Sequence, residues 1–209
     1  MAHPARRWIV AWCLVLTVES ALSRILGLHG TNNLWLSYAS LPLTTGMALW
    51  GLSHWQASNT PRLALRASIP MVMVVTFVLT ITMENTHTFS LVAAPFHSLV
   101  LLLAALWLLI HRSVGAGGAD GALIEHDWFW VTSGLIVYAG TAAAVQPLGL
   151  YLLPKREDLV HAVWTLSSSA WILAFTAIAW GMLCPEPKTS SGGSSPRPSS
   201  QSLSSRADS

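Results

Sequence analysis

Residues 81–97, ITMENTHTFSLVAAPFH, join two long apolar segments of this chain. Glu84, His87 and His97 all lie in this stretch and form the densest group of ionisable residues within apolar sequence. The apolar segments are about 20 residues long, enough for a helix rising about 1.5 Å per residue to cross roughly 30 Å of hydrocarbon. The stretch therefore predicts a polar connection between two membrane-spanning helices.

The composition indicates the same class of protein. The chain has 209 residues, of which 53% are hydrophobic and only 10% are charged, whereas soluble domains average about 25% charged residues. We predict an all-α, polytopic integral membrane helix bundle in residues 1–184, with six transmembrane helices at about residues 8–28, 35–55, 67–83, 90–110, 128–153 and 159–183. Residues 185–209 are rich in Ser, Pro and Gly and have almost nothing apolar to bury, which predicts a disordered tail.

The distribution of basic residues predicts the orientation. Six spans place both termini on one side of the membrane. The connections on that side carry eight basic residues: Arg6, Arg7, Arg62, Arg66, Arg112, Lys188, Arg197 and Arg206. The other side carries two, Lys155 and Arg156. Because cytoplasmic loops are enriched in Lys and Arg, we expect both termini in the cytoplasm and the protein in a plasma or inner membrane.

The first span has a second interpretation. Arg6 and Arg7, the apolar WIVAWCLVL and the small residues around Ala21 resemble a cleavable signal peptide. Cleavage there would leave five spans and remove Glu19. Against this interpretation, the apolar character resumes after Arg24 with ILGL, so we retain the first span.

Polar side chains of the predicted spans gather in the outer half of the bundle. They are Glu19, Arg24, Tyr38, Glu84, His97, Gln146 and His161, with His87 in the adjoining turn. Helical spacing puts each beside small or hydroxylated residues, which are typical of contact faces between membrane helices. His97 shares its face with Ala93, Ala94 and Leu101, and His161 shares its face with Thr165, Ser168, Ile172 and Thr176. We therefore expect these groups to point inward.

Two functional interpretations follow from this clustering. Ionisable groups within a membrane are costly and indicate a functional site by default, so the seven residues predict a pocket that binds or senses a small polar ligand or a lipid headgroup. Alternatively, the same groups form a purely structural polar network that holds the helices together.

Metal chemistry gives two further alternatives. His87, His97 and His161 have the donors for a zinc ion, with Glu84 as a base, as in a membrane-embedded hydrolase. Their spacing matches no motif such as HExxH. In a haem b protein, His97 and His161 would be the axial ligands, which requires the fourth and sixth predicted helices to face each other across a gap.

Several classes are excluded. The net charge of +2, without a basic face, argues against a nucleic-acid partner. The two cysteines, Cys13 and Cys184, lie near opposite ends of the chain and form neither a disulfide framework nor a CxxC site. The chain has no Walker loop, GxGxxG, GxSxG or kinase signature and no inverted repeat. Enzymatic activity is left open.

Overall fold

The computed structural model describes residues 3–84, 90–115, 123–152 and 157–184. Within these ranges the chain is helical, without a β-strand, as predicted. The elements are α1 (Pro4–Leu28), α2 (Leu34–His54), α3 (Asn59–Met83), α4 (Ala93–Gly115), the short 3-10 helix η1 (Leu123–Glu125), α5 (Asp127–Leu152) and α6 (Glu157–Leu183). The predicted tail, residues 185–209, and His87 lie outside the described residues.

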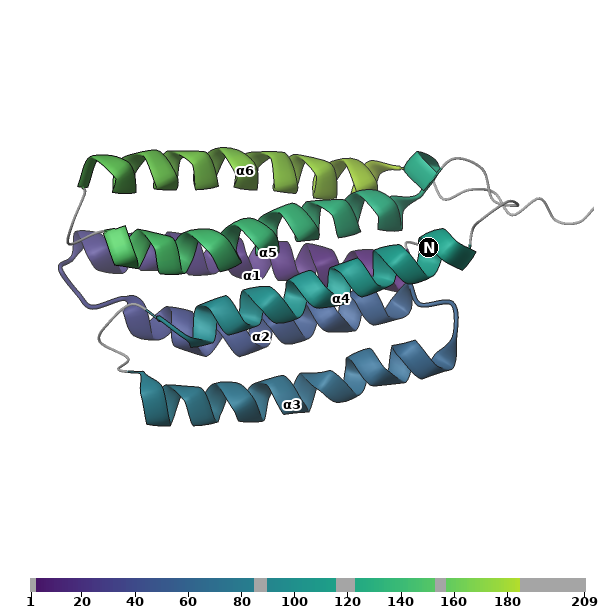
Figure 1. Ribbon diagram of the computed structural model, residues 1–209, viewed down its shortest axis with the longest axis horizontal. Coiled ribbons are helices and arrows are strands. Elements are labelled where there is room, and N and C mark those ends of the chain that lie inside the picture. Colours follow the sequence, from purple (N-terminus) through teal and green to yellow (C-terminus); the bar gives the residue numbers. More distant parts are fainter. Residues whose placement is uncertain (1–2, 85–89, 116–122, 153–156, 185–209) are drawn as a thin grey trace, which may run out of the picture.

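The long helices run side by side and alternate in direction (Figure 1). α2 packs against α1, α3 and α4, and α5 packs against α4 and α6. The start of α1 and the end of α6 lie at one end of the bundle, here called the N-terminal end. The connection from α1 to α2 and the start of α4 lie at the other end, here called the opposite end.

The core forms where α1, α2, α4 and α5 meet. Its fully buried apolar residues include Ile9, Trp12, Ala48, Leu49, Leu52, Ala105, Leu108, Val131 and Leu135. Other helices turn large apolar side chains outward; on α3 these include Met71, Val74, Phe77 and Ile81. Extensive exposed apolar surface marks a face that contacts lipid or another protein, which agrees with a bilayer as the surroundings.

In the described part of the chain, five helices are long and apolar enough to cross a membrane: α1, α3, α4, α5 and α6. α2 is not among them, although it has 21 residues. Its hydroxyl groups lower its hydropathy, and Ser40, Thr44 and Thr45 are buried. Because three helices surround α2, these polar groups face protein. The prediction of a helical membrane protein is thus supported. Five of the six predicted spans are candidates by length and composition, and a bundle of six spans is not confirmed.

The helix boundaries differ most from the prediction at α3, which begins at Asn59 and not near residue 67. Pro61 lies in the first turn, where the missing N–H costs nothing because that group has no partner within the helix. Arg62 and Arg66 consequently lie on the helix itself. Pro42, Pro70 and Pro147 lie inside helices.

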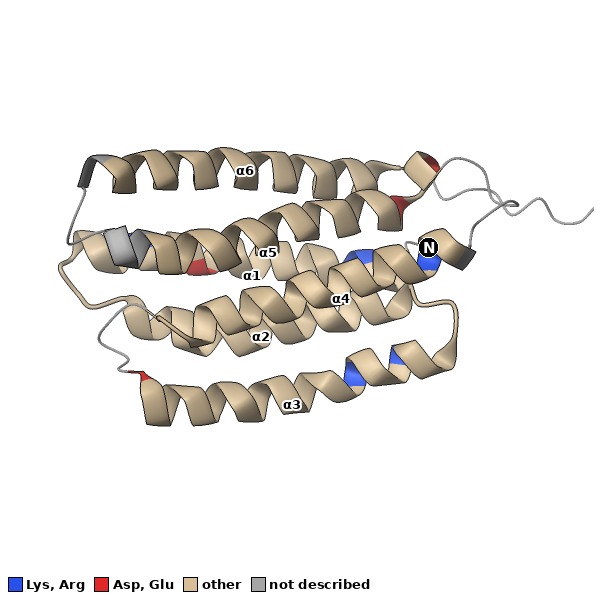
Figure 2. Ribbon diagram, viewed as in Figure 1, with Lys and Arg blue, Asp and Glu red and all other residues tan. Residues whose placement is uncertain are grey.

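At the N-terminal end, Arg6 links α1 to the start of α5 and to the end of α6. Its Nε forms an ion pair of 2.9 Å with Asp127 at the start of α5. Its Nη2 donates to the carbonyl of Cys184 at 2.7 Å, and its Nη1 donates to that of Met182 at 3.3 Å. A cation at the C-terminus of α6 is favourable because it meets the unpaired carbonyls there. The Lys and Arg residues visible in Figure 2 gather at this end.

Candidate functional site

His97 lies at the junction of α2, α3 and α4. Its Nδ1 is 2.7 Å from Oγ1 of Thr45, and its Nε2 is 2.7 Å from Oγ1 of Thr76. The Thr76 hydroxyl donates its only proton to the carbonyl of Val72 at 2.7 Å, so it must accept from Nε2–H. The ring is therefore the neutral Nε2–H tautomer, and Thr45 donates to Nδ1.

This network accounts for every polar atom of the His97 ring. The residue is 1% exposed, so the predicted inward orientation is confirmed, as it is for Ala93, Ala94 and Leu101 on the same face. A metal or haem iron would have to displace one of the two threonines. The arrangement is that of a buried, satisfied histidine that fastens three helices together.

Glu84 follows the end of α3 and caps the start of α4. Its Oε1 accepts hydrogen bonds from the backbone N–H of Val92 at 2.6 Å and of Ala93 at 3.0 Å. The Ser90 hydroxyl donates to the same carboxylate at 2.9 Å and itself accepts from the N–H of Ala94. A carboxylate is stabilised there because it meets unpaired N–H groups at a helix N-terminus. Tyr38 also interacts with Glu84 and Ser90.

Glu19 lies halfway between exposed and buried on α1 and is bonded to α2. The hydroxyls of Ser37 and Ser40 on α2 lie close enough to interact with its carboxylate, and the carboxylate also interacts electrostatically with Tyr138 of α5. Hydroxyl donors satisfy a carboxylate without requiring a cation. Glu19 and Arg24 therefore do not pair with each other, in agreement with their separation of five positions on one helix.

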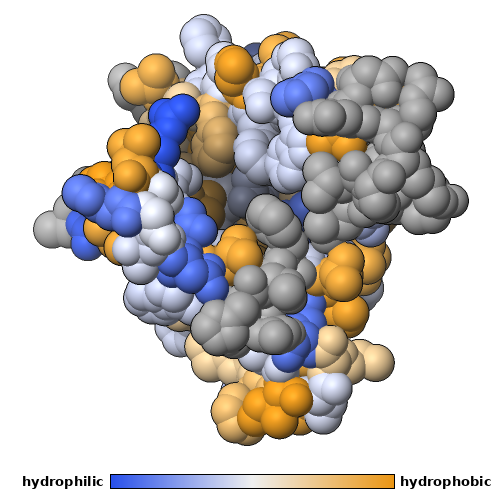
Figure 3. All heavy atoms as spheres, turned by 90° about the vertical axis from the view of Figure 1, so that its left-hand side faces the viewer, coloured by the Kyte–Doolittle hydropathy of each residue, from blue (hydrophilic) through white to orange (hydrophobic). Residues whose placement is uncertain are grey.

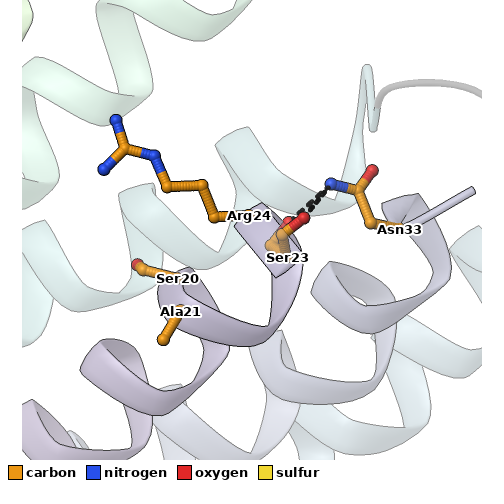
Figure 4. A pocket seen from close by; sticks show the side chains of 5 residues that line it. All are labelled: Ser20, Ala21, Ser23, Arg24 and Asn33. Carbon is orange, nitrogen blue, oxygen red and sulfur yellow. Dashed lines mark hydrogen bonds between the residues drawn. The ribbon is translucent and has the colours of Figure 1, made fainter. Parts of the chain in front are cut away.

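Arg24 borders a hollow of about 490 Å³ at the opposite end. The other lining residues are Ser20, Ala21, Ser23 and Asn33 (Figure 4). The side-chain amide of Asn33 donates to both the carbonyl and the hydroxyl of Ser23 at 2.8 Å, which fixes the connection from α1 to α2 beside the hollow. The Arg24 side chain extends away from this pair, as Figure 4 shows.

No described residue forms a hydrogen bond or ion pair with Arg24. Four of the other described arginines, Arg6, Arg62, Arg66 and Arg112, make such contacts at the N-terminal end. Arg7, which is exposed at the N-terminal end, likewise has no hydrogen bond or ion pair with a described residue. Arg24 is therefore distinguished by its position at the opposite end and by the hollow that it borders. Figure 3 looks onto the opposite end, where hydrophilic and apolar side chains meet around a recess in the surface.

Beside α1, α6 carries a second, more apolar hollow of about 610 Å³. It is lined by Ser168, Trp171, Ile172, Phe175, Thr176 and Ala179. The Phe175 ring lies 6.0 Å from that of Trp12 on α1, and Tyr138 packs against Trp12, Trp171 and Phe175. Among the described residues of α5 and α6, four buried atoms have no hydrogen-bond partner: Oγ1 of Thr132, Oε1 of Gln146, Oγ of Ser167 and Nε1 of Trp171.

The predicted orientation of His161 is wrong. It is exposed, as are Thr165, Ser168 and Ile172 on the same face. α6 instead packs on α5 through Val160, Ser167, Ala174 and Ile178. Glycines decide this choice: a Cβ on Gly134 would lie 2.6 Å from the Ala174 carbonyl oxygen, and one on Gly181 would lie 2.8 Å from that of Asp127.

The described residues do not have the geometry that the zinc and haem alternatives require. Among the described residues no group of three His, Cys, Asp or Glu side chains is placed to hold a metal ion; the predicted ligand His87 lies outside them. His97 is bonded to α2 and α3, whereas α6, which carries His161, packs on α5. The two histidines therefore do not face each other as haem ligands would have to do.

The structure thus divides the seven predicted pocket residues. Glu19, Tyr38, Glu84 and His97 have partners within the protein, Gln146 is partly unpartnered, His161 is exposed, and Arg24 borders the hollow. Sequence reasoning did not identify Thr45 or the serines of α2 as site residues. It suggested Asn33 only as a cap of the second helix, whereas its side chain bonds to Ser23. The available signal was the hydroxyl groups on a helix that three others surround. No protein-family model, curated protein or solved structure matches this chain.

Proposed function

We propose that this chain is a multi-pass membrane protein that binds or senses an anionic, lipid-like ligand at the opposite end of the bundle, with Arg24 as the partner of the anion. The observation that carries the proposal is the unpaired guanidinium of Arg24 beside the hollow. A charge within hydrocarbon costs at least about 2.5–3.5 kcal/mol on insertion scales and needs a partner. The anion of a ligand supplies one.

The surroundings of Arg24 suit an amphipathic molecule. Ser20 and Ser23 offer hydroxyl groups in the same hollow as Arg24. The hollow on α6 offers an aromatic and aliphatic lining, and its Phe175 contacts Trp12 of α1. Arg24 lies roughly 18 Å beyond Trp12 along α1 at about 1.5 Å per residue. A headgroup at Arg24 with a hydrocarbon chain directed towards α6 would use both hollows.

The orientation that we propose follows from the arginines. With α2 as a sixth span, both termini lie in the cytoplasm, in a plasma or inner membrane. In the described part of the chain, the start of α1, the start of α3 and the end of α4 lie at the N-terminal end and carry Arg6, Arg7, Arg62, Arg66 and Arg112, whereas Arg24 lies near the other end of α1. Cytoplasmic ends of spans are enriched in Arg, so the Arg24 hollow would open towards the outer leaflet.

The test replaces Arg24 and supplies ligands that share an oleoyl chain and differ in the charge of the headgroup. Purified protein in a non-ionic detergent is titrated with oleate, with oleoyl lysophosphatidate and with uncharged mono-oleoyl glycerol, and its melting temperature is measured. The two anions should raise the melting temperature and the neutral lipid should not. Arg24→Gln should weaken the apparent affinity for the anions about tenfold, the loss expected for a charge-assisted hydrogen bond, whereas Arg24→Lys should retain part of it.

Arg7→Gln is the matched control, because Arg7 is also exposed on α1 but lies at the other end. Equal stabilisation of the wild type and of Arg24→Gln by the anions would refute the proposal. It would favour the second candidate, a purely structural bundle, which the bonded environments of His97 and Glu84 support for those two residues.

A further inference from the structure

A second arginine-lined groove lies at the N-terminal end, outside the site proposed above. It has a volume of about 430 Å³ and is lined by Asn59, Thr60, Arg62, Leu63 and Arg66, the first turns of α3. Residues four apart share one face of a helix, so the two guanidinium groups border the same groove. None of its lining residues is acidic, and the first turn of α3 has no acidic residue either.

Both arginines are held in place but keep free donors. The Nε of Arg66 donates to the Ser53 hydroxyl at 3.2 Å, and its guanidinium lies 4.4 Å from the centre of the Trp50 ring. Its terminal nitrogens make no hydrogen bond to a described residue. Arg62 donates through Nη2 to the carbonyl of Gln56 at 3.0 Å and through Nη1 to Oδ1 of Asn59 at 3.5 Å. Its Nε is buried and has no partner.

The α2–α3 loop beside the groove contains further unmatched polar groups. Gln56 is 2% exposed, and both atoms of its side-chain amide lack partners, as does Nε1 of the buried Trp55. Leaving a buried polar group unsatisfied is unfavourable. In addition, Ser58 makes no side-chain cap on α3. The N–H groups of the first helical turn therefore add to the surplus of donors.

We propose that this groove binds the phosphate group of an anionic phospholipid. Two guanidinium groups and a helix N-terminus are donors suited to phosphate oxygens. A lipid fits better than a free ion because Leu63 in the groove is exposed and the outer face of α3 continues with exposed Met71 and Val74. The acyl chains would lie along this face while the phosphate stays at the end of the helix.

The experiment uses the full chain in nanodiscs or detergent and the Arg24→Gln background, so that the site at the opposite end does not contribute. The probes are phosphatidic acid, phosphatidylcholine with the same acyl chains, and inorganic phosphate. Bound lipid is counted by native mass spectrometry, and the melting temperature is measured in parallel. Arg62→Gln and Arg66→Gln are compared with Arg7→Gln, which removes the same charge from an exposed position at the same end.

Phosphatidic acid should bind with about tenfold lower affinity to Arg62→Gln and to Arg66→Gln, with no change for Arg7→Gln. Inorganic phosphate should compete only weakly if the lipid is the ligand; full competition at similar concentration would assign the site to free phosphate. Equal binding of phosphatidic acid to all three variants, or equal binding of phosphatidylcholine and phosphatidic acid to the parent, would overturn the proposal. If Arg66→Gln fails to fold without its contact to Trp50, Arg62→Gln decides the result.

Discussion

At the scale of single residues, His97 shows how one polar side chain fixes the packing of three helices. Its inward orientation follows from helical spacing, because Ala94, Leu101 and Ala105 lie on the same face and are buried as well. Its partners do not follow from spacing along α4, because Thr45 and Thr76 belong to other helices. A buried network whose members are all satisfied selects one relative position of these helices, since a shift of register would leave its groups unpaired.

Thr45→Val should destabilise the protein by about 1–2 kcal/mol. Hydrogen bonds between membrane helices average about 0.6 kcal/mol and reach about 1.7 kcal/mol. We expect the upper part of this range because Nδ1 of His97 would be left without a donor in a site enclosed by three helices. The measurement is the free energy of unfolding in mixed detergent micelles.

Thr44→Val is the matched control, because the neighbouring Thr44 is also buried but donates only to carbonyls of its own helix. Its loss should cost less than about 0.5 kcal/mol. Equal losses for the two variants would show that the bond to His97 contributes nothing specific.

At the scale of helices, residue periodicity located most of each element but not every buried face. α1, α2 and α6 begin and end within a few residues of the prediction. On α6, however, Thr165, Ser168 and Thr176 suggested a contact face, whereas Ser167 and Ala174 form the real one. Small and hydroxylated residues occur on both sides of this helix. The choice depends on Gly134 and Gly181, whose effect appears only when two helices meet.

Glu84→Gln should loosen the start of α4. The neutral amide keeps one acceptor but loses the charge that favours the helix N-terminus, a loss of about 1 kcal/mol. Amide hydrogen exchange at Val92 and Ala93, which donate to Glu84, should quicken relative to the middle of α4. Glu125→Gln, at an exposed position of the other end, should leave this exchange unchanged. Unaltered protection in Glu84→Gln would mean that the carboxylate does not cap the helix in solution.

At the scale of the whole molecule, the two ends differ in chemistry, and the sequence predicted this difference better than it predicted the site. Successive spans alternate in direction, so the assignment of the spans also determines at which end each connection lies. The basic residues then fall mostly at one end and the polar residues of the predicted pocket at the other. The pocket itself depends on which polar groups bond to each other. The Glu84 carboxylate accepts hydrogen bonds at the start of α4, and the Glu19 carboxylate interacts with hydroxyl groups of α2. Such pairings need the three-dimensional arrangement. Of the three charged residues of the predicted pocket, they leave Arg24 without a partner among the described residues.

The orientation of α2 decides whether that arrangement crosses the membrane six times. Thr31 and Ser58 are exposed and flank α2 at its two ends. In a variant with Cys13 and Cys184 replaced by Ser, Thr31→Cys should react with a membrane-impermeant maleimide in intact cells, and Ser58→Cys should react only after permeabilisation. α2 tolerates its hydroxyl groups in the membrane because α1, α3 and α4 cover it. Labelling of both positions from outside would place α2 on the membrane surface and leave five spans. Labelling of Ser58→Cys alone from outside would show that the orientation is the reverse of the one proposed. The Arg24 hollow would then open towards the cytoplasm.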